Sequence, residues 1–377
     1  MKLQTFAGIN NVSDSTRLAP GEFTSATNID ILGRGGIKSR LGRRMLVNGS
    51  AHSVYESAFG IFAVVDSDLL LFDSSGNELR LVYETIGYTR VWYVTLPDGR
   101  VAFSNGLING LATASATQTW GVPEPVDAGT GIAGGTLYQI TYVRTSDGRE
   151  GPPADGTLID TTQAIIGLPA LAGHTINVYF APYGEQMFLA GNTATDSFTH
   201  DGSPLSVKYE GGGLGVPPVG TQLALWNSRV LIVDGPTLWA TEPFEPELCD
   251  LTKNFLQFES DITGVYGTSS GVFVGSGNSV SFLNGDALRD LKRAVTSPGR
   301  LTVGSIVEID TGYLSEKIRP DGSQRGALCM VGGHICLLHS DGQVLNLTSG
   351  RYRNELDEVY ATTRLRDGVL QYVAAPA

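Results

Sequence analysis

The sequence of 377 residues has few cysteines, little charge and no long apolar run. Its three cysteines, Cys249, Cys329 and Cys336, are an odd and sparse set, which excludes a small fold held by a disulfide framework. The opening residues lack the apolar stretch of a signal peptide, and no window approaches the ~18 apolar residues of a membrane span. We therefore expect a protein that is made and kept in a reducing cytoplasm without a membrane anchor.

Charged residues make up only 17% of the chain, whereas hydrophobic residues make up 41%, so the composition favours a folded protein over a disordered one. The 48 glycines, together with frequent Thr, Ser and Val, suit short strands joined by tight turns. The net charge of -12 makes the chain a poor candidate for gripping nucleic acid, because such binding needs cations that displace counterions from phosphate.

Helical periodicity is nearly absent, and the recurring pattern is a short apolar run, a Gly or Asp-Gly turn and a second short run. This pattern predicts β-hairpins. Six such units occur, two before residue 120 and four after residue 220: 59–83, 91–105, 228–242, 264–285, 327–349 and 361–375. Repeated hairpins of similar length predict the blades of a propeller, with a plain series of β-sandwiches as the alternative.

The intervening stretch differs, because it opens with a linker-like run rich in Pro and Gly. Tyr138, Ile140 and Tyr142 then alternate on one face of a predicted strand. We expect a compact inserted β-sandwich, similar to fibronectin type III. The predicted domains are an N-terminal basic arm with the first strands at 1–50, a first propeller segment at 51–123, the sandwich at 124–212 and a second propeller segment at 213–377.

The N-terminal segment is basic although the chain is acidic. Residues 1–50 hold seven Lys and Arg against three Asp and Glu, a net charge of +4. Lys38, Arg40, Arg43 and Arg44 form a candidate docking arm for an acidic protein surface, that of a neighbouring copy included. The alternative is a solvated loop.

Two side-chain clusters are candidates for chemical sites. Cys329, His334, Cys336 and His339 superficially suggest zinc, but in a strand His339 points away from the face that His334 and Cys336 share. We therefore interpret these residues as buried cysteines and surface histidines, and expect no metal.

Four carboxylates, Glu242, Glu245, Glu247 and Asp250, cluster around two prolines. Paired carboxylates are the groups used in glycoside hydrolysis. No aromatic platform accompanies them in the sequence, so we expect a solvated or subunit-facing loop. With no nucleophile elbow and no Walker loop, the chain is expected to have no catalytic residues and no cofactor.

Several short sequence motifs, and their order along the chain, resemble those of the bacteriophage tail nozzle family, also called tail tubular protein B. The short matching motifs are Gly8-Ile9-Asn10, Leu18 with Pro20-Gly21-Glu22, Asn28-Ile29-Asp30, Gly36-Ile37-Lys38-Ser39-Arg40-Leu41-Gly42 and Trp120-Gly121-Val122-Pro123-Glu124-Pro125. The longer matching segments are 138–153 with 176–190 in the predicted sandwich, and 238–250 with 262–285 in the second propeller segment. Leu41 replaces the family's usual Pro, and Ala7 its first Gly. Together the motifs and segments cover most of the chain.

This resemblance implies a structural virion protein and not an enzyme. It implies a hexameric ring below an adaptor, which extends the DNA conduit and helps to retain and then release the genome. The implied partners are copies of itself, the adaptor or head-to-tail connector, a tail fibre or needle protein, and double-stranded DNA that passes without being gripped. The implied location is the virion tail, after assembly in the host cytoplasm. The related tail hub that stabilises packaged DNA fits equally, and a propeller-type carbohydrate-binding or glycan-acting protein is the alternative function.

Overall fold

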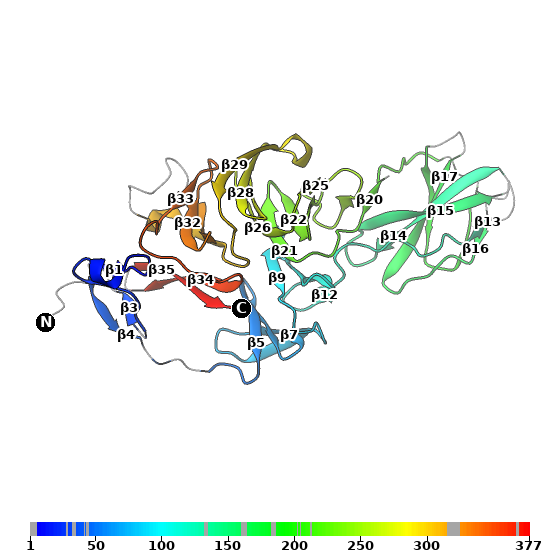
Figure 1. Cartoon of the computed structure of the whole chain (residues 1–377). Coiled ribbons are helices and arrows are strands. Elements are labelled where there is room, and N and C mark those ends of the chain that lie inside the picture. Colours follow the sequence, from blue (N-terminus) through cyan, green and yellow to red (C-terminus); the bar gives the residue numbers. More distant parts are fainter. Residues whose placement is uncertain are drawn as a thin grey trace.

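The protein is described by a computed structural model that covers residues 6–27, 29–31, 35–40, 42, 45–131, 135–159, 164–181, 186–201, 203, 205–211, 213–314, 325–366 and 369–377. These residues form β-strands and loops, and their helical elements are 3₁₀ turns of three residues at Ser15–Arg17, Leu288–Asp290 and Thr311–Tyr313 (Figure 1). The predicted all-β fold class is confirmed. In the described ranges, no helix has the length and apolar character needed to cross a membrane.

Five four-stranded antiparallel sheets follow one another along the chain as propeller blades. They are blade 1, β5 (Ala51–Ser57), β6 (Gly60–Val65), β7 (Asp68–Phe72) and β8 (Glu78–Tyr83); blade 2, β9 (Trp92–Thr95), β10 (Val101–Ser104), β11 (Asn109–Ala112) and β12 (Thr117–Gln118); blade 3, β21 (Gln222–Trp226), β22 (Arg229–Asp234), β23 (Thr237–Ala240) and β25 (Phe255–Gln257); blade 4, β26 (Ile262–Gly267), β27 (Gly271–Ser276), β28 (Ser279–Asn284) and β29 (Lys292–Pro298); blade 5, β30 (Val307–Asp310), β31 (Arg325–Val331), β32 (His334–Leu338) and β33 (Val344–Asn346). The predicted hairpin units fall on these blades, and the sixth falls on β34 (Val359–Arg366) and β35 (Val369–Pro376).

The blades are arranged around an axis with the first strand of each blade innermost. An axial pocket of about 400 Å³ is lined by residues of β5, β9, β21 and β26 and of the segment 304–308, which leads into β30. The inner strands of blades 3 and 4 approach so closely that a Cβ added at Gly267 would lie 2.1 Å from the carbonyl oxygen of Leu225. Each successive pair of blades shares a buried hydrophobic cluster. These contacts make the array a propeller rather than a series of separate sandwiches.

The two ends of the chain close the ring together. The hairpin β34–β35 packs on blade 5, where the Tyr372 hydroxyl donates a hydrogen bond to the Ser305 carbonyl at 2.6 Å. Against blades 1 and 2, the Arg90 guanidinium lies 4.0 Å from the ring centre of Trp92 and 4.4 Å from that of Tyr360. It also donates to the Val359 carbonyl at 2.7 Å. The hairpin thus occupies the sixth position around the axis.

N-terminal strands complete this sixth position. They are β1 (Gly8–Ile9), β2 (Glu22–Phe23), β3 (Ile29–Ile31) and β4 (Ile37–Ser39). We call β1–β4 with β34–β35 the terminal module. Its anchor is the buried Asp30 carboxylate, which accepts hydrogen bonds from Arg364 and Arg366. Burial by itself raises the pKa of Asp30, but Arg364, Arg366 and Arg40 outweigh it, so the pKa lies below its ordinary value.

A separate β-sandwich interrupts the propeller between blades 2 and 3 (Figure 1). Its strands are β13 (Thr130–Gly131), β14 (Thr136–Arg144), β15 (Glu150–Ile159), β16 (Ala164–Ile166), β17 (His174–Ala181), β18 (Phe188–Thr193) and β19 (Ser197–Thr199). One sheet has the order β13-β16-β19 and the other β15-β14-β17-β18. All seven strands lie within the predicted 124–212, and the predicted inserted sandwich is present.

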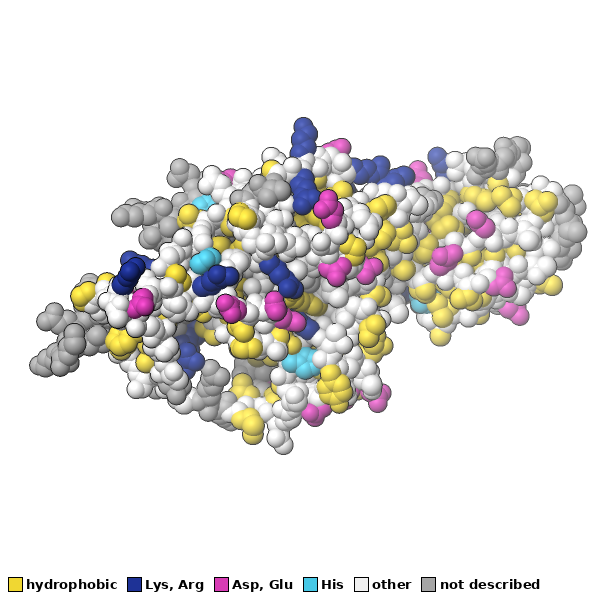
Figure 2. Space-filling model, viewed as in Figure 1, with side chains coloured by type: hydrophobic (Ala, Val, Ile, Leu, Met, Phe, Trp, Pro, Cys, Tyr) yellow, Lys and Arg dark blue, Asp and Glu magenta, His cyan; other side chains and the backbone are white. Residues whose placement is uncertain are grey.

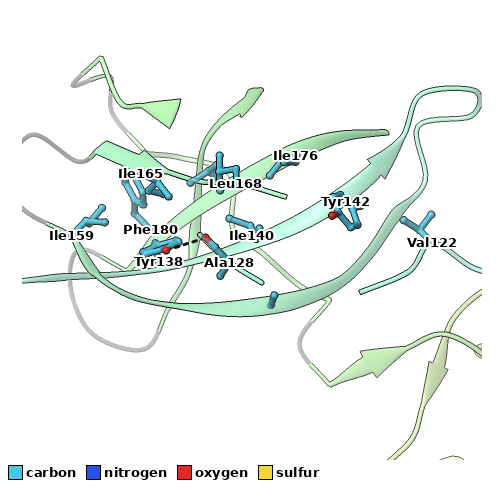
Figure 3. Close-up of a cluster of buried hydrophobic side chains, with 12 residues drawn as sticks. Val122, Ala128, Tyr138, Ile140, Tyr142, Ile159, Ile165, Leu168, Ile176 and Phe180 are labelled. Carbon is cyan, nitrogen blue, oxygen red and sulfur yellow. Dashed lines mark hydrogen bonds between the residues drawn. The ribbon is translucent and has the colours of Figure 1, made fainter. Parts of the chain in front are cut away.

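The sandwich core lies between its two sheets (Figure 3). Tyr138, Ile140 and Tyr142 face inward, as their alternation predicts. The buried Tyr138 hydroxyl donates to the carbonyls of Ala128 and Gly129, both at 2.9 Å. The single polar atom of this large ring is therefore satisfied inside the core. The sandwich has its own core and is a domain in the physical sense.

Candidate functional site

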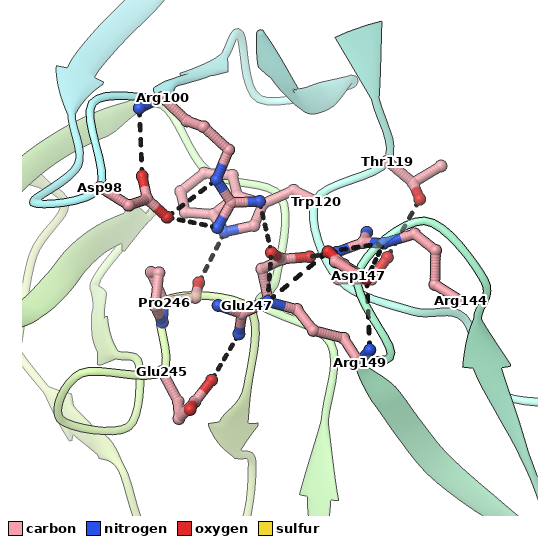
Figure 4. Close-up of polar contacts among 11 residues, drawn as sticks. Asp98, Arg100, Thr119, Trp120, Arg144, Asp147, Arg149, Glu245, Pro246 and Glu247 are labelled. Carbon is pink, nitrogen blue, oxygen red and sulfur yellow. Dashed lines mark hydrogen bonds and ion pairs between the residues drawn. The ribbon is translucent and has the colours of Figure 1, made fainter. Parts of the chain in front are cut away.

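The most elaborate polar site lies where the sandwich meets blades 2 and 3 (Figure 4). Glu247, on the loop between β23 and β24 (Cys249–Asp250), has a side chain that is only 2% exposed. One carboxylate oxygen lies 2.6 Å from Arg100, and the other lies 2.7 Å from Arg144. Arg149 approaches the first oxygen at 3.2 Å. One buried carboxylate thus joins three guanidinium groups from two domains, and we call these four residues the Glu247 cluster.

Further carboxylates surround the Glu247 cluster. Asp98 pairs with Arg100 and Asp147 with Arg144, each at 2.7 Å, and Glu245 pairs with Arg149. The hydrogen bond from Arg144 lowers the pKa of Asp147, which stays charged. Burial lowers the pKa of Arg144, but Asp147 and Glu247 outweigh this effect, so the net shift is upward. Every charge of the cluster is therefore matched by a close opposite charge.

The backbone also builds this site. The Trp120 indole donates to the Pro246 carbonyl at 2.7 Å. Gly121 has φ +95°, and a Cβ there would lie 3.0 Å from the Glu247 carbonyl oxygen, so a side chain would be strained at this position. The segment Trp120–Pro123, which leads into the sandwich, therefore packs directly on the acidic loop between β23 and β24 of blade 3.

The expectation of a solvated or subunit-facing loop is wrong for Glu247 and Asp250, both of which are buried. It holds for Glu245, whose side chain is 51% exposed. Sequence reasoning missed the cluster because its arginines lie about a hundred residues or more from Glu247. A usable signal was Arg144, a charged residue directly after Val143 at the end of the predicted strand.

A cavity of about 760 Å³ opens beside the cluster. Glu150 lines it and accepts hydrogen bonds from the Tyr179 hydroxyl at 2.6 Å and the Asn177 amide at 3.1 Å. Burial and the neighbouring Glu150 raise the pKa of Tyr179, so this hydroxyl keeps its proton. Glu150 is held by these hydrogen bonds, and Asp98, Asp147, Glu245 and Glu247 are paired with arginines, so the arrangement fixes two domains.

The axial pocket is the second candidate site. Tyr55, Trp92 and Tyr266 line it together with Gln222 and Glu308. Each inner strand pairs on only one side, which leaves the edge of the strand facing the axis. The pocket thus combines aromatic rings with main-chain polar groups, a lining typical of small-ligand sites.

The structure places the candidate docking arm only in part. Arg40 lies 3.6 Å from the Asp30 carboxylate, so its charge is used within the terminal module. Lys38 stands opposite Asp30 in the β3–β4 ladder. Arg43 and Arg44 lie outside the described residues, and their docking role stays a prediction.

The four residues Cys329, His334, Cys336 and His339 lie on or next to the β31–β32 hairpin of blade 5 but do not converge on one point. Cys329 and Cys336 are direct cross-strand partners and both are buried, and burial raises the pKa of Cys336 to about 11. His334 contacts the Tyr352 carbonyl at 2.9 Å, and the expectation of surface histidines is wrong for His339, which is buried after β32. Among the residues that the structure describes, no group of three or more His, Cys, Asp and Glu side chains is arranged to hold a metal ion.

No protein-family model matches the chain, and no curated protein matches it in sequence. Solved structures resemble it at low similarity. The C-terminal WD40 domain of Sif2 has a TM-score of 0.37 and 10% identity, covering 95% of this chain and 90% of that domain. Virginiamycin B lyase from Staphylococcus aureus has a TM-score of 0.33 and 9% identity, covering 82% and 87%. Both are β-propeller proteins. At these scores the likeness carries no functional argument, and this chain's own blade order and axial pocket identify it as a propeller-type protein with an inserted sandwich.

Proposed function

We propose that this chain is a structural protein of a bacteriophage tail, where copies form a ring, six in number, that extends the DNA conduit below the adaptor. Its role there is mechanical and not enzymatic. The expected partners are other copies, the adaptor or head-to-tail connector, a tail fibre or needle protein, and double-stranded DNA in transit. Its expected location is the virion tail, after assembly in the host cytoplasm.

The observation that carries this proposal is the Glu247 cluster. A binding module or enzyme needs unpaired polar groups that face a ligand, but here the buried charges of Glu247 and Arg144 hold one domain against another. A fixed angle between sandwich and propeller suits a subunit whose copies must repeat one geometry around an axis. The sandwich is inserted between two propeller segments, and the sequence motifs shared with the nozzle family imply the same domain order.

The charge of the chain supports the passage of DNA without binding. A net charge of -12 repels phosphate, so a duplex inside such a ring slides instead of sticking. The same charge is common among soluble proteins, so it supports the proposal only together with the domain order.

The test is the position and copy number of the protein in phage particles. Antibodies raised against the chain should label the tail tip, and a reconstruction should place six copies on the axis below the connector. Labelling of the capsid or of fibres off the axis, or absence from purified particles, would contradict the proposal.

A second candidate, a propeller-type carbohydrate-binding protein, is favoured by the axial pocket. Tyr55 stacks on Tyr93 with ring centres 5.2 Å apart, and Trp92 lines the same pocket. Aromatic rings beside polar groups are suited to the apolar faces and hydroxyls of sugars. Calorimetry with a panel of mono- and disaccharides tests this function: binding that Trp92→Ala abolishes and Trp239→Ala leaves intact would favour it over the tail role.

A further inference from the structure

The axial pocket gathers aromatic rings from three blades. Tyr55 of β5, Trp92 of β9 and Tyr266 of β26 all line it. Its volume of about 400 Å³ lies in the range of about 300–1,000 Å³ that is typical of small-molecule sites. The faces of such rings carry negative electrostatic potential, so they attract cations as well as apolar groups.

One charged side chain lines this pocket among the described residues, and it is the carboxylate of Glu308. Ile306 and Glu308 both line the pocket and are two positions apart, as expected for residues on one face of an extended segment. The Glu308 side chain is 54% exposed. It therefore lies where the pocket meets solvent.

The arginines near Glu308 leave its charge open to a ligand. Arg325 lies 3.5 Å from Glu308, but its own side chain is 83% exposed. Exposed pairs of this kind are weak, because water and salt screen them. Arg90 lies over the rings of Trp92 and Tyr360. Neither arginine is among the described residues that line the pocket.

Tyr266 and Glu308 form one wall of the pocket. Tyr266 and Ile306 pack in the same hydrophobic cluster, which brings the phenol ring close to Glu308. Burial raises the pKa of Tyr266, and the negative charge of Glu308 raises it further. The hydroxyl therefore keeps its proton, and the carboxylate is the anion that this wall presents beside an aromatic ring.

Gln222 adds a polar group that the protein leaves without a partner. This residue of β21 lines the pocket and is only 5% exposed. Its side-chain amide has no hydrogen bond to any other residue in the described part of the chain. A buried amide destabilises the fold unless it is hydrogen-bonded, so a ligand in the pocket that bonds to it gains affinity.

The charge of the whole chain favours the same class of ligand. Its net charge is -12, and Figure 2 shows acidic side chains spread over both the propeller and the sandwich. A field of this sign raises the local concentration of cations and lowers that of anions. Aromatic rings, a carboxylate and a spare amide together fit a cation that also carries a hydrogen-bonding group.

We propose that the axial pocket binds a small organic cation, an amine or quaternary ammonium group with a short polar tail. The cationic head lies against Tyr266 and Glu308, and the tail bonds to the amide of Gln222. Cation–π attraction and the carboxylate both stabilise the head, whereas a neutral sugar gains nothing from the charge of Glu308. The site is independent of the tail role and differs from the carbohydrate function in the charge of its ligand.

Two probes of the same shape separate charge from apolar contact. Choline carries a quaternary ammonium group, and 3,3-dimethyl-1-butanol has carbon in place of the nitrogen and is neutral. Titration calorimetry of the full chain at low salt, where the Debye length is about 30 Å, should give choline an affinity about tenfold above that of the neutral probe. High salt should weaken the binding of choline and leave that of the neutral probe unchanged.

Three variants assign the contacts. Glu308→Gln should lower the affinity for choline about tenfold and leave that for the neutral probe unchanged. Gln222→Leu should lower the affinity for both probes, because each carries a hydroxyl group that bonds to the amide. Glu78→Gln removes an exposed carboxylate of β8, outside the pocket, and should bind choline like the native chain.

Urea midpoints that match the native one show that the variants are folded. Equal affinity for the two probes, no binding of choline, or equal losses in Glu308→Gln and Glu78→Gln would each overturn the proposal. A saccharide that binds to a chain that does not bind choline would also overturn it, and would support the carbohydrate function instead. Virion position is measured separately, so either result leaves the tail proposal to its own test.

Discussion

Replacing Glu247 by Gln should loosen the sandwich from the propeller. The substitution keeps the shape but removes a charge that is 2% exposed and faces Arg100, Arg144 and Arg149. Removing one partner of a buried ion pair costs about 3–5 kcal/mol, and here three guanidinium groups lose the buried carboxylate that they share and keep only their outer partners Asp98, Asp147 and Glu245. We expect the free energy of unfolding to fall by about that amount.

Glu245→Gln is the matched control, because it sits on the same loop and faces Arg149 but is 51% exposed. An exposed pair contributes about 0–1 kcal/mol. Urea unfolding followed by tryptophan fluorescence suits the measurement, since Trp120 donates to the Pro246 carbonyl beside the cluster. Equal losses for the two variants, or a loss below about 1 kcal/mol for Glu247→Gln, would refute the reasoning that burial makes this carboxylate essential.

The remaining predictions concern the ring and the acid side of the stability curve. Arg90→Lys keeps a charge but loses a planar group stacked between Trp92 and Tyr360, so thermal unfolding should report a loss of about 1–2 kcal/mol. Gly267→Ala drives a Cβ against the Leu225 carbonyl and should cost about 1–3 kcal/mol in urea, while Gly135→Ala, which meets nothing within 4 Å, should not. Because Arg144 lowers the pKa of Asp147, the stability from this contact is complete above the unfolded pKa of about 4 and is lost as pH falls through the folded value. Urea midpoints measured from pH 5 to 2 should therefore fall less steeply for Asp147→Asn than for the native chain.

Turn positions and the inward faces of strands can be predicted from the sequence. The Asp98-Gly99 and Asp341-Gly342 pairs predict turns because Gly accepts positive φ, and the structure has φ +87° at Gly99 and +95° at Gly342. The alternation of Tyr138, Ile140 and Tyr142 likewise identifies the inward face of the sandwich. Such signals depend on residues close in sequence, and they locate the six hairpin units and the inserted domain.

Pairings between distant residues are not readable in this way. In the sequence Asp30 is only one of three acids in a basic segment, yet it is bound by Arg364 and Arg366, more than 330 positions away. The sequence around Glu247 predicts a solvated loop, because none of the residues near it in sequence indicates that three arginines contact its carboxylate. Charge patterns in sequence suggest which groups are free, and only the fold decides which are already paired.

The closure of the ring by both termini has a consequence for how the protein is made. The sandwich is one continuous stretch with its own core, so it is able to fold while the rest of the chain is still being synthesised. Asp30 must wait for Arg364, which follows 334 residues later. At ribosomal speeds this is a delay of roughly 15–70 s, during which the Asp30 carboxylate lacks the two arginines of β34 that bind it. Synthesis of β34 and β35 is thus the event that completes the propeller.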